Sequence, residues 1–154
     1  MVKVLFVCHG NICRSPMAEF VMKDLVKKQG LEAEFYIASA ATSAEEIGNG
    51  VHYGTRQKLA EVGISTAGKT AVQLKKSDYE KYDFIIGMES YNVVNMKRII
   101  PKDEDKKICR LLDFGDKPRD IADPWYTGNF DITYEDVYEG CQAFLNYLRR
   151  EGRC

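Results

Sequence analysis

Apolar and polar positions along this chain predict strands and helices in turn. Residues 2–7, VKVLFV, form a near-continuous apolar run that is typical of a strand buried on both faces. Further strands are expected at 33–39, 83–88 and 106–112, and further helices at 51–63 and 90–99. A final helix is predicted from apolar positions at helical spacing, namely Tyr134, Val137, Tyr138, Cys141, Phe144, Leu145 and Leu148.

Capping residues predict where two helices begin. Ser15 and Pro16 occupy the N-cap and first positions of a helix that is expected to run from Pro16 to Gln29. Thr133 and Asp136 are placed as the N-cap and third residue of the last helix. Strands that alternate with helices favour an α/β fold, in which a parallel sheet is covered on both faces and ligands bind beyond the carboxyl ends of its strands.

Composition fits a single globular domain, because 154 residues with 45% hydrophobic side chains allow one substantial core. Lys and Arg number 22 against 23 Asp and Glu, so neither nucleic acid nor a membrane is expected as a partner. The N-terminus lacks the apolar region of a signal peptide, and a cytoplasmic protein is expected. Five cysteines without framework spacing predict that at least some thiols are free.

The segment VCHGNICRSP at 7–16 carries the strongest chemical signal. A strand ends at Val7, a short loop containing Gly10 and Asn11 follows, and a helix is expected from Ser15. Turns of this kind direct backbone N–H groups toward an anion, and the helix N-terminus adds partial positive charge. The loop therefore suits a phosphate-sized oxyanion.

Cys8 and Arg14 frame this loop with five residues between them. The loop amides and Arg14 would stabilise a Cys8 thiolate, while the planar Arg14 fork grips two oxygens of a phosphoryl group. Ser15 is placed to donate a hydrogen bond to the thiolate, and Asn11, which tolerates positive φ, to hold the shape of the loop. The predicted phosphate-binding residues are His9, Gly10, Asn11, Ile12, Cys13, Arg14 and Ser15.

Two other interpretations compete for this segment. A cysteine after a strand is more often a small core residue than a nucleophile, but the flanking strand, the loop residues and the helix start all agree with a phosphate loop. CHGNIC could also begin a metal site, yet zinc needs further closely spaced ligands, and the remaining cysteines and His52 are scattered. Neither a metal nor a cofactor is expected.

The sequence resembles the low-molecular-weight protein-tyrosine phosphatases, whose signature loop near the N-terminus matches Cys8 through Ser15. The resemblance covers nearly the whole chain and includes SAATS at 39–43, EIG at 46–48, GMESYN at 87–92 and DPWYTG at 123–128. It implies a four-stranded parallel sheet with helices on both faces, a phosphate-binding loop between the first strand and the first helix, and one domain over residues 1–154. It also implies hydrolysis of phosphotyrosine in proteins.

Asp123 is the candidate proton donor for that reaction. A tyrosine oxyanion, whose conjugate acid has a pKa of ~10, leaves more easily if a proton arrives with it. In isolation Asp123 would more simply begin a turn before Pro124, but the family uses such an Asp-Pro-aromatic-aromatic segment for catalysis. Trp125 and Tyr126 offer a wall for a substrate ring.

The predicted reaction has two steps. Cys8 attacks phosphorus while Asp123 protonates the leaving phenol, and water then hydrolyses the phosphocysteine with Asp123 as base. Arg14 and the loop amides stabilise the charge on phosphate throughout. A bell-shaped pH profile on the acid side of neutrality is expected, because Cys8 must be ionised while Asp123 is protonated.

Three further positions bear on regulation and specificity. By resemblance Cys13 is the family's second loop cysteine, able to form a reversible disulfide with an oxidised Cys8, although packing beneath the loop is an equally good interpretation. Glu45 stands where many relatives carry an aromatic residue, so this wall of the substrate cleft is expected to be less apolar. Gly68 stands where mammalian members have a histidine near the network that supports the loop.

Three rival functions are open. Arsenate reductases of this fold need resolving cysteines after the third strand, where IIGMESYN has none. Protein-arginine phosphatases of the family carry a threonine before the second loop cysteine, where this chain has Ile12. A non-catalytic phosphate-binding module would have no need of Cys8, Arg14 and Asp123 together. A monomeric phosphatase acting on tyrosine-phosphorylated proteins is therefore expected.

Overall fold

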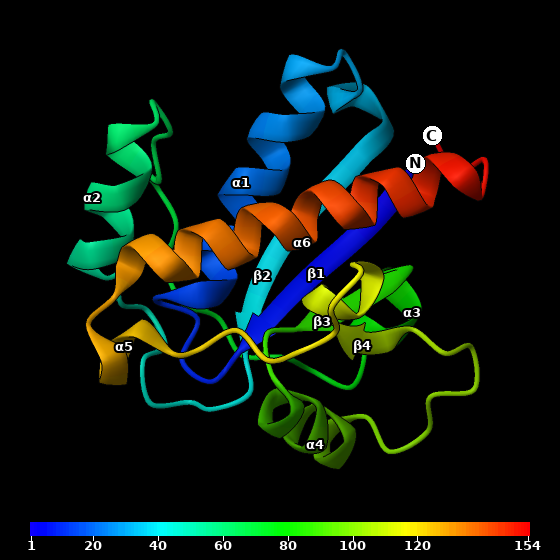
Figure 1. Ribbon diagram of the computed structural model, residues 1–154. Helices are drawn as coiled ribbons and strands as arrows, with labels where there is room; N and C mark the ends of the chain where they lie inside the picture. Colours follow the sequence, from blue (N-terminus) through cyan, green and yellow to red (C-terminus); the bar gives the residue numbers. More distant parts are fainter.

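The computed structural model describes residues 1–154 and contains a four-stranded parallel sheet (Figure 1). Its strands are β1 (Val2–Cys8), β2 (Phe35–Ala41), β3 (Phe84–Gly87) and β4 (Ile108–Arg110). The strands lie in the order β2-β1-β3-β4, so the central strand β1 pairs on one side with β2 and on the other with β3. The expected parallel sheet is confirmed.

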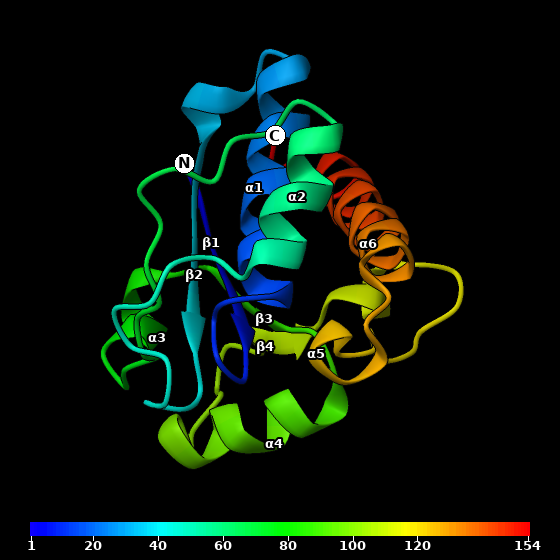
Figure 2. The same cartoon turned by 90° about the vertical axis from the view of Figure 1, so that its left-hand side faces the viewer.

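Helices cover both faces of the sheet, and they are α1 (Arg14–Lys28), α2 (Tyr53–Glu61), α3 (Asp78–Lys81), α4 (Ser90–Ile99), α5 (Pro124–Thr127) and α6 (Phe130–Arg150). Alternate side chains of β1 enter two separate cores. Val4 and Phe6 pack in a large core with α1 and α6, whereas Leu5 and Val7 pack in a smaller one with α4. Figure 2 shows α1 and α6 on one side of the strands and α3 on the other. No helix combines the length and apolarity that crossing a bilayer requires.

The central position of β1 determines where a ligand can bind. From β1 the chain crosses through α1 to β2, and it later returns to β3 on the opposite side of β1. In an open parallel sheet, such a reversal of winding direction leaves a crevice at the carboxyl ends of the strands. Cys8 is the last residue of β1 and therefore lies at this crevice.

The predicted start of α1 is wrong by two residues. The helix begins at Arg14, and Cys13 rather than Ser15 occupies the N-cap position, without a capping hydrogen bond from its side chain. Ser15 lies inside the first turn because its hydroxyl is directed at the Cys8 sulfur, 3.0 Å away. The first turn of α1 thus serves the phosphate loop instead of ending in a conventional cap.

The predicted cap of α6 and the predicted end of β4 are also wrong. Asn129 caps α6 by accepting the N–H of Ile132 at 3.0 Å, which agrees with the stronger capping preference of asparagine over threonine. Thr133 lies one turn further on, where its hydroxyl donates to the Asn129 carbonyl at 3.2 Å. β4 stops at Arg110 because the chain turns there into a short 3-10 helix over Leu111–Phe114.

Candidate active site

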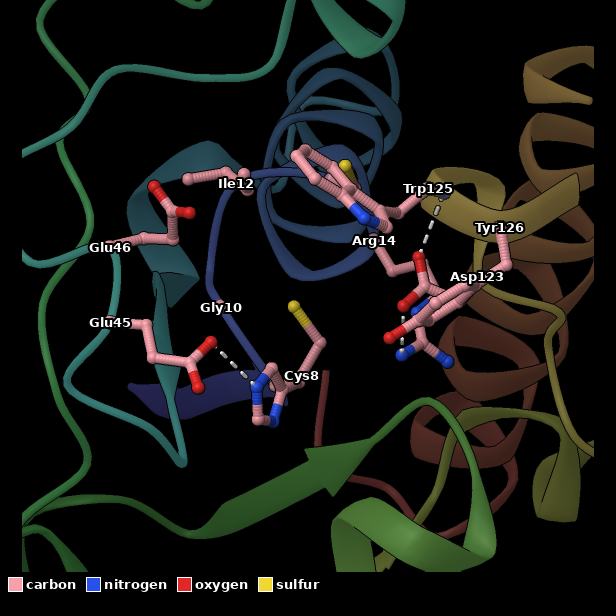
Figure 3. A pocket seen from close by; sticks show the side chains of 11 residues that line it. Cys8, Gly10, Ile12, Arg14, Glu45, Glu46, Asp123, Trp125 and Tyr126 are labelled. Atoms are coloured by element: carbon pink, nitrogen blue, oxygen red, sulfur yellow. Dashed lines mark hydrogen bonds and ion pairs between the residues drawn. The ribbon is translucent and has the colours of Figure 1, made fainter. Parts of the chain in front are cut away.

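The phosphate loop, residues 8–15, curls around the sulfur of Cys8 (Figure 3). The Cys8 Sγ atom lies 3.3 Å from the backbone nitrogen of Asn11 and 3.4 Å from that of Ser15, and both N–H groups donate to it. The Ser15 hydroxyl oxygen is 3.0 Å from the same sulfur. Two backbone N–H donors and the Ser15 hydroxyl thus surround the Cys8 sulfur, which is the predicted nucleophilic atom.

Asn11 holds the loop in shape from inside. Its backbone has φ 58, a left-handed conformation that asparagine adopts more readily than most residues. Its Nδ2 donates to the hydroxyls of Ser15 at 2.7 Å and Ser39 at 2.9 Å, while its Oδ1 accepts the N–H of Val72 at 3.1 Å. Asn11 is almost fully buried, so these bonds join the loop to β2 and to the segment that follows α2.

A charged cluster below Asn11 was not foreseen from the sequence. The Ser39 hydroxyl donates to Glu19 Oε1 at 2.5 Å, and Lys23 Nζ lies 2.6 Å from Glu19 Oε2. Lys69 Nζ donates to the Ser39 carbonyl at 2.8 Å, and burial lowers the pKa of this ammonium group although Glu19 opposes the shift. The available signal was Glu19 itself, a charged residue on the buried side of α1.

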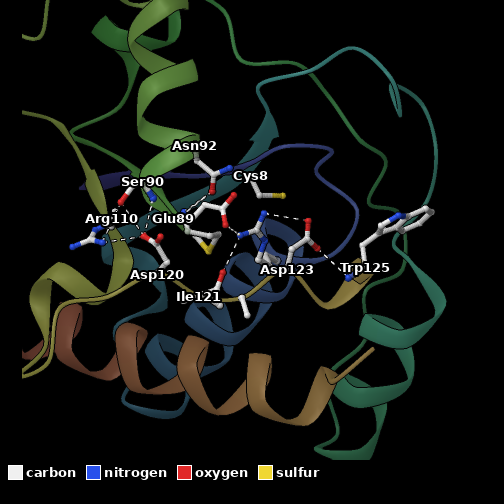
Figure 4. Close-up of polar contacts among 12 residues, drawn as sticks. Cys8, Glu89, Ser90, Asn92, Arg110, Asp120, Ile121, Asp123 and Trp125 are labelled. Atoms are coloured by element: carbon white, nitrogen blue, oxygen red, sulfur yellow. Dashed lines mark hydrogen bonds and ion pairs between the residues drawn. The ribbon is translucent and has the colours of Figure 1, made fainter. Parts of the chain in front are cut away.

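Arg14 is fully buried behind the loop and is held at three points. Figure 4 shows the residues that hold it, Glu89, Ile121 and Asp123, close to one another. One terminal nitrogen, Nη1, donates to the Ile121 carbonyl at 2.9 Å and lies 3.0 Å from Glu89 Oε2. The other, Nη2, lies 3.4 Å from Asp123 Oδ2. The guanidinium group is therefore oriented before any ligand arrives, which lowers the cost of gripping a phosphate.

Glu89 is a functional side chain that sequence reasoning missed. It precedes α4, and Asn92 Oδ1 fixes it by accepting its backbone N–H at 3.0 Å. The GMESYN segment contributes to the family resemblance, but nothing near it in the sequence indicates a partner for Glu89. Its partner, Arg14, comes from a distant part of the chain.

Asp123 begins the acid loop, a name used here for residues 123–128. Its Oδ1 accepts the backbone N–H of Trp125 at 3.0 Å, so Asp123 is the N-cap of the short helix α5. Its Oδ2 faces Arg14. The Asp123 side chain therefore begins a turn and also lies beside the phosphate loop.

A cavity of about 150 Å³ opens between these two loops. Glu45 and Glu46 line one side of it, and Trp125 and Tyr126 stand across from them (Figure 3). Glu45 Oε2 lies 3.2 Å from His9 Nε2. The residues that line the cavity are Cys8, His9, Gly10, Ile12, Cys13, Arg14, Glu45, Glu46, Asp123, Trp125 and Tyr126. The structure thus brings every predicted site residue to this cavity except Asn11 and Ser15, which support the Cys8 sulfur from below.

Cys13 also borders the cavity but differs from Cys8 in its surroundings. Burial, and next the charge of Cys8, raise the pKa of the Cys13 thiol to about 12. Its carbonyl accepts the Thr55 hydroxyl at 3.1 Å, which ties the loop to α2. Cys109 and Cys141 lie elsewhere, and all five cysteines are free.

The chain matches a family model described as low molecular weight phosphotyrosine protein phosphatase over residues 3–154. The protein belongs to this family. Among its relatives, the low molecular weight protein-tyrosine-phosphatase YfkJ of Bacillus subtilis is 39% identical over 153 residues, covering 98% of each chain. PtpA of Staphylococcus epidermidis, named in the same way, is 34% identical over 98% of this chain and 96% of its own.

Solved structures of low molecular weight phosphatases confirm the α/β fold. The crystal structure of YfkJ from Bacillus subtilis has a TM-score of 0.93 at 40% identity and covers 98% of this chain and 96% of its own. A Drosophila arginine phosphatase has a TM-score of 0.88 at 28% identity, with 96% and 98% coverage. Since proteins named for tyrosine and for arginine share this fold, the choice of substrate depends on the residues of the cavity.

Proposed function

We propose that this protein hydrolyses phosphotyrosine in proteins, and small aryl phosphates, through a phosphocysteine intermediate. The observation that carries the proposal is the Cys8 sulfur, surrounded by two backbone N–H donors and the Ser15 hydroxyl, at a cavity where Arg14 and Asp123 lie 3.4 Å apart. Nucleophile, anion clamp and proton donor are thus assembled around a space that fits one phosphoryl group.

In the first step the Cys8 thiolate attacks phosphorus. The S–P bond forms while the bond from phosphorus to the phenolic oxygen breaks, and that oxygen takes both the bonding electron pair and a proton from Asp123. Arg14 and the loop N–H groups hold the phosphoryl oxygens, whose charge they stabilise in the transition state. The Trp125 and Tyr126 side chains flank the departing ring.

In the second step water attacks the phosphocysteine. The Asp123 carboxylate accepts a proton from that water, the P–S bond breaks, and the electron pair returns to the Cys8 sulfur. Inorganic phosphate leaves with the thiolate restored. The amides around Cys8 stabilise the departing sulfur in this step as they stabilise the nucleophile in the first. Fixed donors do the electrostatic work, so the mechanism calls for neither metal nor cofactor.

Ile12 favours phosphotyrosine over phosphoarginine. It lines the cavity with a branched apolar side chain, which cannot offer a hydroxyl to a guanidinium group. The aromatic side chains of Trp125 and Tyr126 complement a phenyl ring. An arsenate reductase is disfavoured because the partly buried Cys109 and the fully buried Cys141 both lie away from the cavity and do not form a resolving pair for Cys8.

Cys13 is proposed as a redox partner of Cys8. Peroxide converts the Cys8 thiolate to a sulfenic acid with release of hydroxide. The Cys13 thiol then attacks the Cys8 sulfur, an S–S bond forms, and the sulfenic oxygen leaves as water. Equal recovery of activity by wild type and Cys13→Ser after peroxide and thiol treatment would leave Cys13 with a packing role alone.

We further propose that the enzyme works as a monomer in the cytoplasm. Five free thiols fit a reducing compartment, and the nearly balanced charge gives no attraction to nucleic acid or to anionic lipid. Light scattering of the purified protein tests the oligomeric state, and a dimer mass would contradict the proposal.

The first experiment measures phosphate release from matched phosphotyrosine and phosphoarginine peptides, with Cys8→Ser as the blank and Ile12→Thr as the matched variant. Turnover confined to phosphotyrosine, with a gain on phosphoarginine in Ile12→Thr, supports both the reaction and the role of Ile12. Preference for phosphoarginine in the wild type keeps the mechanism but changes the substrate. No turnover of either peptide would favour a phosphate-binding module.

A further inference from the structure

His52 contacts three parts of the protein: the phosphate loop, the acid loop and the start of α6. The proposed mechanism needs the two loops in fixed positions relative to each other. It is the N-cap residue of α2, and its backbone N–H donates to the carbonyl of Ile12 in the phosphate loop at 2.8 Å. Thr55, one turn further on, bonds the neighbouring Cys13 carbonyl. The beginning of α2 is therefore fastened to the phosphate loop through backbone groups that do not depend on the His52 side chain.

The His52 ring itself contacts the acid loop. Its centroid lies 5.5 Å from that of Trp125, with the rings at 72°, an edge-to-face arrangement that aromatic rings favour. On another side it stacks on Phe130 at the start of α6, with centroids 5.3 Å apart and planes at 13°. Trp125 is 58% exposed, so the His52 contact is one of few that restrain it.

The orientation of the His52 ring is set by the cap. Nδ1 accepts the N–H of Gly54 at 3.0 Å, which fixes the ring relative to α2. Gly54 also allows the close approach of α2 to Phe130, because a Cβ atom at this position would lie 2.4 Å from that ring. The cap, the glycine and the two aromatic contacts thus place the imidazole between the acid loop and the start of α6.

Movement of Trp125 is transmitted to Asp123 through the backbone. The Trp125 N–H donates to Asp123 Oδ1, and this bond begins the one-turn helix α5. A four-residue helix has little stability of its own. We infer that His52 is a positioning residue for the general acid: its ring holds Trp125, and through Trp125 holds Asp123, at the proper place above the phosphate loop. This inference rests on the proposed function, since it assumes that Asp123 protonates a leaving group.

Two substitutions separate the ring of His52 from its capping nitrogen. His52→Asn keeps an acceptor at the N-cap, where asparagine is among the preferred residues, but removes the ring. His52→Phe keeps an aromatic ring for Trp125 and Phe130 but removes the acceptor. If the ring positions the acid loop, the catalytic rate falls in His52→Asn, whereas the melting temperature falls more in His52→Phe.

The dependence of the hydrolysis rate on the leaving group tests the inference, because a merely structural role of His52 would not change that dependence. Phenyl phosphate needs a proton on its departing oxygen more than p-nitrophenyl phosphate does, because nitrophenol is the stronger acid. We expect His52→Asn to lower kcat/KM, which reports the first step alone, about tenfold on phenyl phosphate with little change on p-nitrophenyl phosphate. His52→Phe should stay near wild type in this ratio. Equal losses on both substrates, or a His52→Phe ratio like that of His52→Asn, would overturn the inference.

A second measurement does not depend on turnover. Trp125 is the single tryptophan of the chain, so its fluorescence reports on the acid loop directly. We expect acrylamide to quench Trp125 more strongly in His52→Asn than in wild type, and His52→Phe to restore the protection; an unchanged quenching constant in His52→Asn would refute the contact. A wild type that hydrolyses neither aryl phosphate would instead defeat the proposed function, and the quenching data would still decide whether His52 holds Trp125.

Discussion

The phosphate loop and the acid loop face each other across one cavity but are built in opposite ways. In the phosphate loop, Asn11, Arg14 and Ser15 are all at most 1% exposed, and their side chains are tied to β2, α4 or the Cys8 sulfur. In the acid loop, Trp125 is 58% and Tyr126 84% exposed. The side chains that support the phosphate loop lie in the core although His9 is exposed, whereas the aromatic side chains of the acid loop lie on the surface.

The difference corresponds to what each loop has to recognise. Every substrate presents the same phosphoryl group, so fixed donors can be oriented for it during folding and need no rearrangement during reaction. The tyrosine leaving group is the same in every phosphoprotein, but the residues around it differ, and a lightly restrained aromatic wall can accept different neighbours. We therefore expect substitutions in the phosphate loop to act on chemistry and stability together, and most substitutions in the acid loop to act on chemistry alone.

The largest expected contrast lies within the phosphate loop itself, between its two thiols. With a pKa of about 12, Cys13 is a thiolate in only ~10⁻⁵ of molecules at pH 7, and the neutral form persists until the pH approaches that value. In the wild type, where the Cys8 charge that helps to raise the Cys13 pKa is present, the initial rate of iodoacetamide labelling at pH 7 should be at least about 10³-fold higher at Cys8 than at Cys13. Peptide mass mapping measures both rates, and similar rates would show that the loop does not distinguish its sulfurs.

Asp123→Asn should give the next largest effect and confine it to chemistry. Without a proton donor, kcat on phenyl phosphate is expected to fall about 10²-fold or more, while unfolding in urea is nearly unchanged because asparagine also caps helices. Steady-state kinetics and urea unfolding measure the two effects, and a wild-type kcat in Asp123→Asn would contradict the assignment.

Asn11→Ala tests whether the phosphate loop is part of the core. The substitution removes bonds to Ser15, Ser39 and Val72 and leaves alanine in a left-handed conformation, so a loss of about 2 kcal/mol in the free energy of unfolding is expected. Asn11→Gly loses the same bonds but tolerates the conformation, and it should be less destabilised by about 1 kcal/mol. Urea denaturation of both variants checks this, and two nearly wild-type curves would be evidence against it.

Tyr126→Phe should give the smallest effect. The Tyr126 side chain is almost fully exposed, so removal of its hydroxyl is expected to change the free energy of unfolding by less than about 0.5 kcal/mol. The ring remains available to a substrate, and KM for an aryl phosphate should change less than about twofold, since only the hydroxyl is lost. A larger change in the free energy of unfolding or in KM would mean that the Tyr126 hydroxyl makes contacts that its exposure does not indicate.

Local sequence was sufficient to predict the strands, most helices and the phosphate loop. The apolar run of β1, Gly10 and Asn11 in the turn, and the helix that follows are close neighbours in the chain, and short-range periodicity and turn preferences govern such elements. The errors at Ser15 and Thr133 arose where two residues compete to begin one helix, because the outcome then depends on what else each side chain can bond.

The tertiary structure alone decided which side chains support the phosphate loop. Arg14 bonds Ile121 and Asp123 across 107 and 109 residues, and Glu89, Lys69 and His52 likewise reach the site from distant segments. No periodicity or spacing in the sequence encodes such pairs, since they exist only because β1 lies at the centre of the sheet and brings several loops to one end. The sequence by itself predicted the residues proposed to carry the chemistry, because a nucleophile, its loop and the helix after it are formed from consecutive positions; the fold decided how firmly each is held.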